Sequence, residues 1–447
     1  MKFLTGDDTG LIKLVRVEGQ KIERLGDRRR GDGIQRLCWA GGPDDPEAAF
    51  AVAYASGALE LRDARGQSLS SARSAEGVKC LQACAAGVLA ISADGSASVV
   101  TSWGKAPEVA DTDAGSGVQV DTFQLQAPVA HAAVDPGRPS RFAFGGLEND
   151  VKIFDLERKE VTWTARNVRE DFLCLRVPVK VNSLGWATKM CPERSLITCG
   201  TADGKIRVYD ANTQRRPLFE LRVGYKVGAG AGGWTGTEDD TRRPIVCSKV
   251  ASVRGDGWSL FVGDTLGVLR EYDLRNLSKT KSAAVPPGKK AHLDIANKEL
   301  PFKRGYRGVM GAIRDVDVHC SGKALAAVGL GRFAYVFPTV GKEMICKVYL
   351  KQKLNCVLMS SEAMETPKED KDQEEGEEEQ AEKDEEDEDA GAEAGAAAED
   401  EVEEGFSDDE AEAKKSSQDP PAGKTKGKRK KRRPSGGSQK RRPKKKA

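Results

Sequence analysis

The residue types that usually carry enzyme chemistry are present in this chain, but their spacing does not bring them together. The 447 residues include 3 histidines, which lie far apart, and His131 and His319 fall in strand-like runs where we expect a packed or hydrogen-bonded imidazole. No Cys-x-x-Cys pair occurs, and Cys80 and Cys84 have no second pair of ligands nearby, so we expect no zinc site. No serine stands in a nucleophile elbow. The pattern predicts a chain without a metal or catalytic centre.

Two short motifs match phosphate-binding loops but lack the surroundings that such loops need. Residues 228–233 have the glycine spacing of a dinucleotide-binding loop, yet they open no helix and lie in a glycine-rich insertion, residues 224–243, that we expect to be a flexible loop. The Gly-Lys-Thr at 423–425 lacks the earlier glycine of a phosphate-binding loop, because Gln418 stands there. We therefore predict a binding scaffold that is not an enzyme and takes no cofactor and no small-molecule substrate.

One stretch supplies the repeating structural unit of the chain. In residues 195–210 an apolar run ends in Asp203-Gly204, a pair that favours the positive φ angles of a tight turn, and alternating apolar and charged residues follow. This is the pattern of a β-hairpin. Similar stretches recur along the chain, with turn positions at Gly10, Gly57, Gly95, Asn149, Gly204, Gly267 and Gly331.

A further strand-like run precedes most of these hairpins, and an outer run follows several of them. Four strands in each of seven units predict an all-β fold, a seven-bladed β-propeller of the WD40 type, although no unit ends in Trp-Asp. The first hairpin begins at Phe3 with no strand before it, whereas residues 354–359 form a strand-like run with no hairpin after it. We expect this C-terminal run to complete the first blade and close the ring.

Charge divides the chain into three segments. Residues 1–360 carry 52 basic and 41 acidic side chains and most of the aromatic residues, so we assign the propeller to them. Residues 361–412 carry 27 acids and 3 bases, and residues 413–447 carry 16 bases and 1 acid. Neither segment can bury enough apolar surface to offset the entropy of ordering. We expect an acidic disordered segment followed by a basic disordered tail.

Several features indicate the compartment. The 10 cysteines lie mostly in apolar runs with no secretory signal before them, which favours reduced thiols in the nucleus or cytosol, and no run is long enough to span a membrane. Ser407 stands among acids and suits an acid-directed kinase. Two basic clusters predict nuclear or nucleolar targeting, with a solubilising tail as the alternative; they comprise Lys428, Arg429, Lys430, Lys431, Arg432, Arg433, Lys440, Arg441, Arg442, Lys444, Lys445 and Lys446.

A second insertion, residues 278–311, is basic, with 8 Lys or Arg and 2 acids. Basic side chains interleaved with aromatic rings suit phosphate contact and base stacking, so one interpretation is RNA binding. A solvated basic loop is the other. The residues concerned are Lys303, Arg304 and Arg307, with the rings of Phe302 and Tyr306.

Some stretches are not general features of propellers, in particular Arg-Asn-Val-x-x-Asp-x-Leu-x-Leu-x-x-Pro from Arg166 and the Arg-Arg-Pro that begins at Arg215. In these stretches the chain resembles the nucleolar WD-repeat factors of large ribosomal subunit assembly, the family of WD repeat-containing protein 74 in animals and of the Nsa-type factors in yeast. The resemblance runs in order through residues 1–360. It is carried by residues 5–13, 165–179, 198–210, 214–220 and 347–358.

This resemblance implies a non-catalytic assembly factor on nucleolar precursors of the large (60S) ribosomal subunit that supports pre-rRNA processing. It also implies proteins and rRNA of that particle as partners, release by a nuclear AAA-type ATPase, a link to an RNA exosome helicase, and a monomer within a large complex. A WD-repeat adaptor in a chromatin or ubiquitin-ligase complex is the alternative.

Polar residues of the family stretches that lie outside the hairpins are the candidates for partner binding. For Asn167 and Asp171 a structural role competes, because both residue types suit the capping of a turn between blades. The candidates are Arg166, Asn167, Arg169, Asp171, Arg215 and Arg216.

Overall fold

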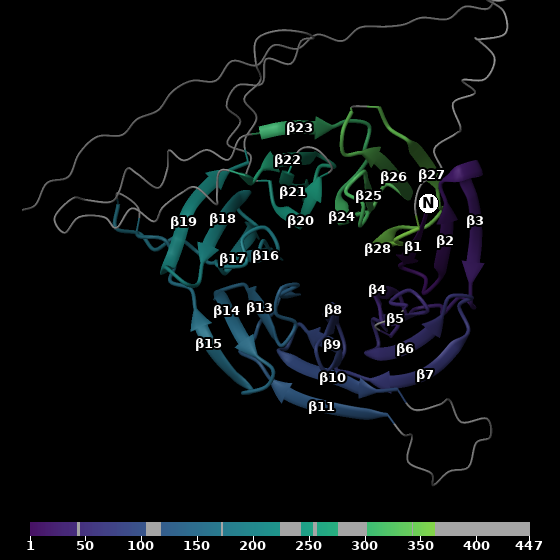
Figure 1. Ribbon diagram of the computed structural model, residues 1–447, viewed down its shortest axis with the longest axis horizontal. Coiled ribbons are helices and arrows are strands. Elements are labelled where there is room, and N and C mark those ends of the chain that lie inside the picture. Colours follow the sequence, from purple (N-terminus) through teal and green to yellow (C-terminus); the bar gives the residue numbers. More distant parts are fainter. Residues whose placement is uncertain are drawn as a thin grey trace, which may run out of the picture. The chain divides into compact units, whose positions relative to one another are not determined.

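Seven four-stranded antiparallel sheets stand around a common centre in the computed structural model (Figure 1). The structure describes residues 1–42, 45–103, 118–170, 173–223, 243–253, 257–275, 302–341 and 343–362. The predictions for Asp171, Ser407, the acidic segment from residue 363 and both basic clusters lie outside these residues. Met1–Pro367 form one unit by their contacts. No helix in the described ranges combines the length and apolar character that a membrane crossing needs.

Each sheet is one blade, and its four strands are arranged side by side in order from the centre of the ring to the rim. The first strand of each blade below faces the centre, and the last lies at the rim. Blade 1 consists of β28 (Leu354–Met359), β1 (Lys2–Asp7), β2 (Ile12–Arg16) and β3 (Lys21–Leu25); blade 2 of β4 (Ile34–Trp39), β5 (Ala49–Tyr54), β6 (Ala58–Asp63) and β7 (Ser68–Arg73); blade 3 of β8 (Val78–Cys84), β9 (Gly87–Ser92), β10 (Ser96–Ser102) and β11 (Gln119–Gln124).

The remaining blades follow the same order and confirm the predicted seven-bladed propeller. Blade 4 consists of β12 (His131–Val134), β13 (Arg141–Gly146), β14 (Asn149–Asp155) and β15 (Glu160–Thr164); blade 5 of β16 (Val181–Trp186), β17 (Leu196–Thr201), β18 (Lys205–Asp210) and β19 (Gln214–Arg222); blade 6 of β20 (Ile245–Val253), β21 (Gly257–Asp264), β22 (Leu269–Asp273) and β23 (Phe302–Tyr306); blade 7 of β24 (Ile313–Val318), β25 (Ala324–Gly329), β26 (Phe333–Pro338) and β27 (Cys346–Tyr349).

The hairpin turns lie where the repeat pattern predicts them, with two adjustments. Gly204 has φ 72°, and a Cβ there would stand 2.7 Å from the carbonyl oxygen of Arg243, so the turn requires glycine. In blade 4 the left-handed residue is Glu148 (φ 50°) and in blade 7 it is Arg332 (φ 66°), so the expected turn positions Asn149 and Gly331 are each wrong by one residue. The hairpin itself is retained, because its strand pairing and not one residue type sets the register.

Apolar layers between neighbouring blades form the core. Between blades 5 and 6, for example, Leu196 and Val208 pack in one cluster with Leu260 and Val262, and all four side chains are buried. The alternation of the second and third strands places one row of side chains toward each neighbouring blade. Each blade is therefore held by the two beside it, and the core forms a ring.

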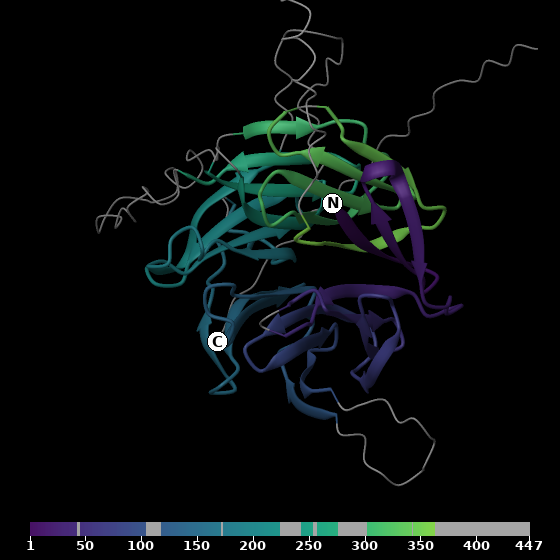
Figure 2. The same ribbon diagram turned by 45° about the vertical axis from the view of Figure 1, so that its right-hand side comes forward.

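The C-terminal strand closes this ring as the sequence predicts. β28 pairs antiparallel with β1, from Phe3 opposite Met359 to Asp7 opposite Leu354. Figure 2 shows the purple N-terminal strands beside the yellow-green C-terminal ones. Asn355 Nδ2 also donates to the Ile34 carbonyl oxygen of blade 2 at 2.7 Å. Backbone N–H groups of β28 donate to carboxylates of blade 7, as when Met359 donates to Asp317 at 2.9 Å. β28 thus joins blades 7, 1 and 2.

Deletion of the chain from Lys353 onward should destabilise the whole propeller, whereas deletion after Glu362 should not. Leu354, Cys356 and Met359 are each at least 95% buried, and each large apolar side chain contributes about 1.5–3 kcal/mol. Their loss alone approaches the total stability of about 5–15 kcal/mol that is typical of a domain. Thermal melts followed by circular dichroism would test this, and equal melting temperatures for the two shortened chains would contradict the closure.

Candidate functional site

The segment that connects β15 to β16 crosses the junction between blades 4 and 5, and hydrogen bonds tie it down at both ends. At its start the Ala165 N–H donates to the Val151 carbonyl at 2.8 Å, and the Arg166 N–H donates to the Arg215 carbonyl at 2.7 Å. At its end the Glu148 N–H donates to the Val179 carbonyl at 2.8 Å. We call residues 165–180 the connecting segment. Both blades thus hold the two ends of this segment.

Asn167 joins three parts of this region. Its Nδ2 donates to the Val177 carbonyl at 2.6 Å, across the connecting segment. Its backbone carbonyl accepts from Arg216 Nη1 at 2.8 Å, and its Oδ1 accepts from Arg207 Nη1 at 3.3 Å. These are the contacts of a residue that shapes a loop, the structural role that the sequence left open for Asn167.

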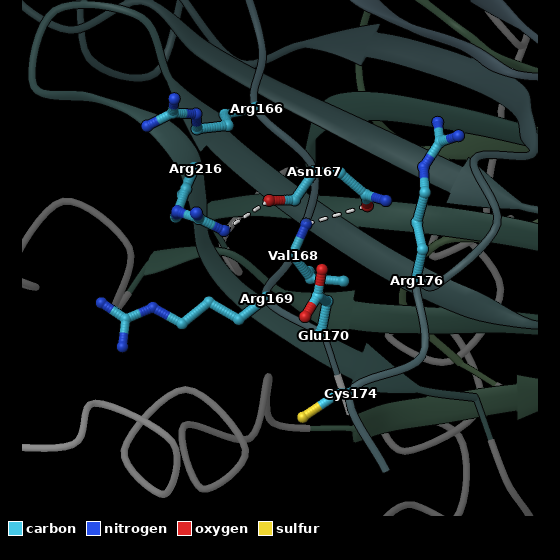
Figure 3. Close-up of a pocket in the computed structure, with 8 residues that line it drawn as sticks. All are labelled: Arg166, Asn167, Val168, Arg169, Glu170, Cys174, Arg176 and Arg216. Carbon is cyan, nitrogen blue, oxygen red and sulfur yellow. Dashed lines mark hydrogen bonds between the residues drawn. The ribbon is translucent and has the colours of Figure 1, made fainter. Parts of the chain in front are cut away.

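A cavity of 660 Å³ opens beside Asn167, and arginines dominate its wall (Figure 3). The guanidinium groups of Arg166, Arg169 and Arg216 lie on one side of the segment, and Arg176 extends on the other. Among the described residues of the lining, Glu170 is the one that is acidic. We call this the arginine cavity; it is lined by Arg166, Asn167, Val168, Arg169, Glu170, Cys174, Arg176 and Arg216.

The cavity has an excess of positive charge that its own residues do not neutralise. Among the described residues, the side chains of Arg166 and Arg169 take part in no hydrogen bond or ion pair. Partial burial and the positive charges of Arg166 and Arg169 lower the pKa of Arg216 below its ordinary value. Arg176 is paired with Glu148 at 2.9 Å. A carboxylate or phosphate entering the cavity would therefore relieve repulsion between guanidinium groups.

The structure brings together part of the predicted site. Arg166, Asn167, Arg169 and Arg216 line the cavity, and Arg215 lies beside them, but its Nε donates to the Thr164 carbonyl at 2.7 Å and so helps to hold the blade junction. The sequence reasoning missed Arg176, although the family stretch at residues 165–179 contains it. Its proximity to the other arginines follows from the return of the connecting segment, which residue types alone do not show.

The second predicted group, in the basic insertion, is corrected by the structure. Phe302–Tyr306 form β23, the outer strand of blade 6, and not a loop. Tyr306 is 5% exposed and donates through its hydroxyl to Glu271 at 3.0 Å, so its ring cannot stack on a base. Arg304 pairs with the same carboxylate at 2.8 Å, and Lys303 lies 3.5 Å from it. Residues 278–301 lie outside the described ranges.

Lys303 and Arg304 thus balance a buried carboxylate, since the Glu271 side chain has 0% exposure. Arg307, which follows β23, is exposed. Lys303 and Arg304 belong to blade 6, Arg307 directly follows it, and none of the three lines the arginine cavity. The expected loop is thus a strand at Phe302–Tyr306, where Lys303, Arg304 and Tyr306 contact Glu271. A part of Lys303 and Arg304 in partner binding stays a prediction.

Several described groups that could carry chemistry are buried and either hydrogen-bonded or protonated. His131 Nδ1 accepts from the Leu184 N–H at 3.2 Å, and burial with the positive charges of Arg36 and Lys249 lowers the pKa of His131 to about 3. Burial raises the pKa of the Cys80 and Cys199 thiols to about 12. In the part of the chain that the structure describes, no group of three or more His, Cys, Asp or Glu could hold a metal ion.

The chain is similar to known proteins over most of its length. No protein-family model matches it. WD repeat-containing protein 74 of Bos taurus is 28% identical over 365 residues, which cover 79% of this chain and 80% of the relative. The protein of the same name from Homo sapiens is 27% identical, with 79% and 80% covered. Ribosome biogenesis protein NSA1 of Meyerozyma guilliermondii is 28% identical over 246 residues, 52% of this chain and 55% of the relative.

Replacing Glu271 by alanine should destabilise the protein by about 3 kcal/mol, because Lys303 and Arg304 would lose the carboxylate that neutralises them inside blade 6. Denaturant unfolding measures the change. The exposed Glu160 on β15 provides the control, and Glu160→Ala should alter stability by less than about 0.5 kcal/mol. Equal effects of the two variants would contradict the structural role of Lys303 and Arg304.

Asn167→Ala should lower the free energy of unfolding by about 1–2 kcal/mol, since the carbonyl of Val177 and the guanidinium of Arg207 both lose a partner. Arg169→Ala, in the same cavity, should leave stability unchanged. An Asn167→Ala variant as stable as the wild type would show that Asn167 does not hold the connecting segment.

Proposed function

Because the chain is a homologue of WD repeat-containing protein 74 and of NSA1, we propose that it is a ribosome biogenesis factor that acts as a scaffold. In this proposal the propeller binds proteins and rRNA on nucleolar precursors of the large (60S) ribosomal subunit and supports pre-rRNA processing without catalysing a reaction. The name of NSA1 supports the process, and the closed propeller supports the mode of action.

The arginine cavity is the observation that carries the proposal. Arg166 and Arg169 project from a segment whose start is hydrogen-bonded to two blades, which lowers the entropy cost of binding a partner there. Residues 1–360 hold 52 basic and 41 acidic side chains, a net charge of +11 that favours association with a polyanionic particle. Packed histidines and protonated thiols support a role in binding over a role in catalysis.

The finer parts of the proposal come from the resemblance. A nuclear AAA-type ATPase would release the factor from the particle, an RNA exosome helicase would act nearby, and the chain would be a monomer within the complex. Residues 361–412 would be an acidic disordered segment, and the basic residues after 413 would direct the protein to the nucleus and nucleolus. Ser407 would be a phosphorylation site. Arg307 remains a proposed contact on blade 6.

Sedimentation of the tagged full chain through a sucrose gradient tests the proposal. We expect comigration with large-subunit precursors that disappears when rRNA synthesis stops. Replacing Arg166 and Arg169 together by glutamate should lower the particle-bound share by about tenfold or more, because even one charge-assisted hydrogen bond contributes about 1.5–3 kcal/mol.

Arg24→Glu with Arg73→Glu is the matched control, as these two exposed arginines carry the same charge change on blades 1 and 2. This variant should sediment like the wild type. Co-purification of histones or a cullin adaptor in place of large-subunit precursors would contradict the proposal and favour a chromatin or ubiquitin-ligase adaptor.

A further inference from the structure

We propose that the arginine cavity and the exposed leucines around it form a docking site for an acidic protein segment that also carries apolar side chains. The inference rests on the proposed function, because it names the kind of partner that this surface would meet on the particle. The partner that we propose for the cavity is a protein, although other surfaces of the proposed scaffold would bind rRNA.

The positive charges of the cavity favour the binding of carboxylates. The guanidinium groups of Arg166 and Arg169 have no partner among the described side chains, and burial, together with their positive charges, lowers the pKa of Arg216. The nearby Glu148 is already occupied, since its two oxygens bind Arg176 at 2.9 Å and the Val179 N–H at 3.2 Å. Planar guanidinium groups bind carboxylates through paired hydrogen bonds. An incoming Asp or Glu would supply acceptors that the described side chains do not offer to Arg166 and Arg169.

Apolar side chains stand exposed on the same segment. Leu173 is 61% exposed and Leu175 is 59% exposed, on either side of Cys174 in the cavity wall. Leu147, at 56% exposure, precedes Glu148, the partner of Arg176. Each of these three leucines is the chain neighbour of a cavity residue or of Glu148, and we assign them as the apolar part of the docking site. A partner with apolar side chains would cover them.

The composition of the surface separates protein from RNA. Single-stranded RNA sites commonly stack bases on aromatic rings, and the described residues that line the cavity include no aromatic side chain. RNA phosphates could reach the arginines but would leave the leucines in water. Protein interfaces join arginine to an apolar centre. One occupant that matches both the charged and the apolar parts is an acidic segment with leucine-like side chains.

Fluorescence anisotropy with the full chain tests this proposal. The probe is a short labelled peptide that alternates glutamate and leucine, compared with the same peptide carrying serine for leucine, a lysine–leucine peptide and a single-stranded RNA oligonucleotide. We expect the glutamate–leucine peptide to bind most tightly. The Arg166→Glu, Arg169→Glu variant should weaken it by about tenfold or more. Leu173→Ser with Leu175→Ser should weaken it severalfold, and Arg24→Glu with Arg73→Glu should have no effect.

Cys174 reports on the location of the bound peptide. Both Cys174 and Cys320 are exposed, but Cys174 lines the cavity, whereas Cys320 lies beyond β24 in blade 7. Bound peptide should slow the alkylation of Cys174 and leave that of Cys320 unchanged, as measured by mass spectrometry. Equal protection of the two thiols would overturn the assignment.

Three other results would also overturn the inference. They are absence of peptide binding, binding that survives the arginine replacements, and RNA binding that is tighter than peptide binding and insensitive to the leucine replacements. Failure of this inference can be told apart from failure of the proposed function. Tight peptide binding without comigration with large-subunit precursors would leave the docking site standing and remove the proposed particle.

Discussion

The pairing of β28 with β1 is the contact on which the rest of this propeller depends. Every other blade is built from consecutive strands, whereas blade 1 takes its innermost strand from the opposite end of the folded chain. Without it, β1 would present an unpaired edge at the centre of the ring, and the apolar layers on both sides of blade 1 would open. Asn355 and Asp317 extend the closure into blades 2 and 7. The blades therefore share one closed core.

Several charged side chains buried inside the blades are paired with side chains of opposite charge, and the arginine cavity differs from them in this respect. In blade 2, Glu60 lies 2.8 Å from Arg62, and in blade 5, Glu220 lies 2.7 Å from Arg207. Although burial raises the pKa of Glu220, Arg207 and Lys205 hold it below its ordinary value overall. Glu271 plays the same part in blade 6. In these three blades, arginines buried or partly buried in the strands are thus matched by carboxylates, because an unpaired buried charge is costly.

The connecting segment carries arginines that are not paired with a described carboxylate, and the lack of pairing costs little stability there. Arg166 and Arg169 are exposed, so water solvates them until a partner arrives. The surrounding hydrogen bonds from Asn167 and Arg215 fix the backbone, and a rigid backbone with unmatched charge is suited to recognition. Structural and recognition roles are therefore divided among adjacent residues: the amide of Asn167 shapes the loop that presents the arginines on either side.

The sequence by itself determined the local architecture. Asp203-Gly204 and its counterparts located the hairpins, because turn chemistry and period-two alternation act within a few residues, and the run 354–359 could be assigned to blade 1 because one strand was missing there. The tertiary structure alone decided which charges are matched. Lys303 and Arg304 had the composition of an RNA-binding loop, but their pairing with Glu271 depends on the register between β22 and β23, strands far apart in the chain. The position of Arg176 beside the other arginines likewise depends on the tertiary structure, through the return of the connecting segment. Contacts across strands and blades are set by register and closure, which residue spacing along the chain does not encode.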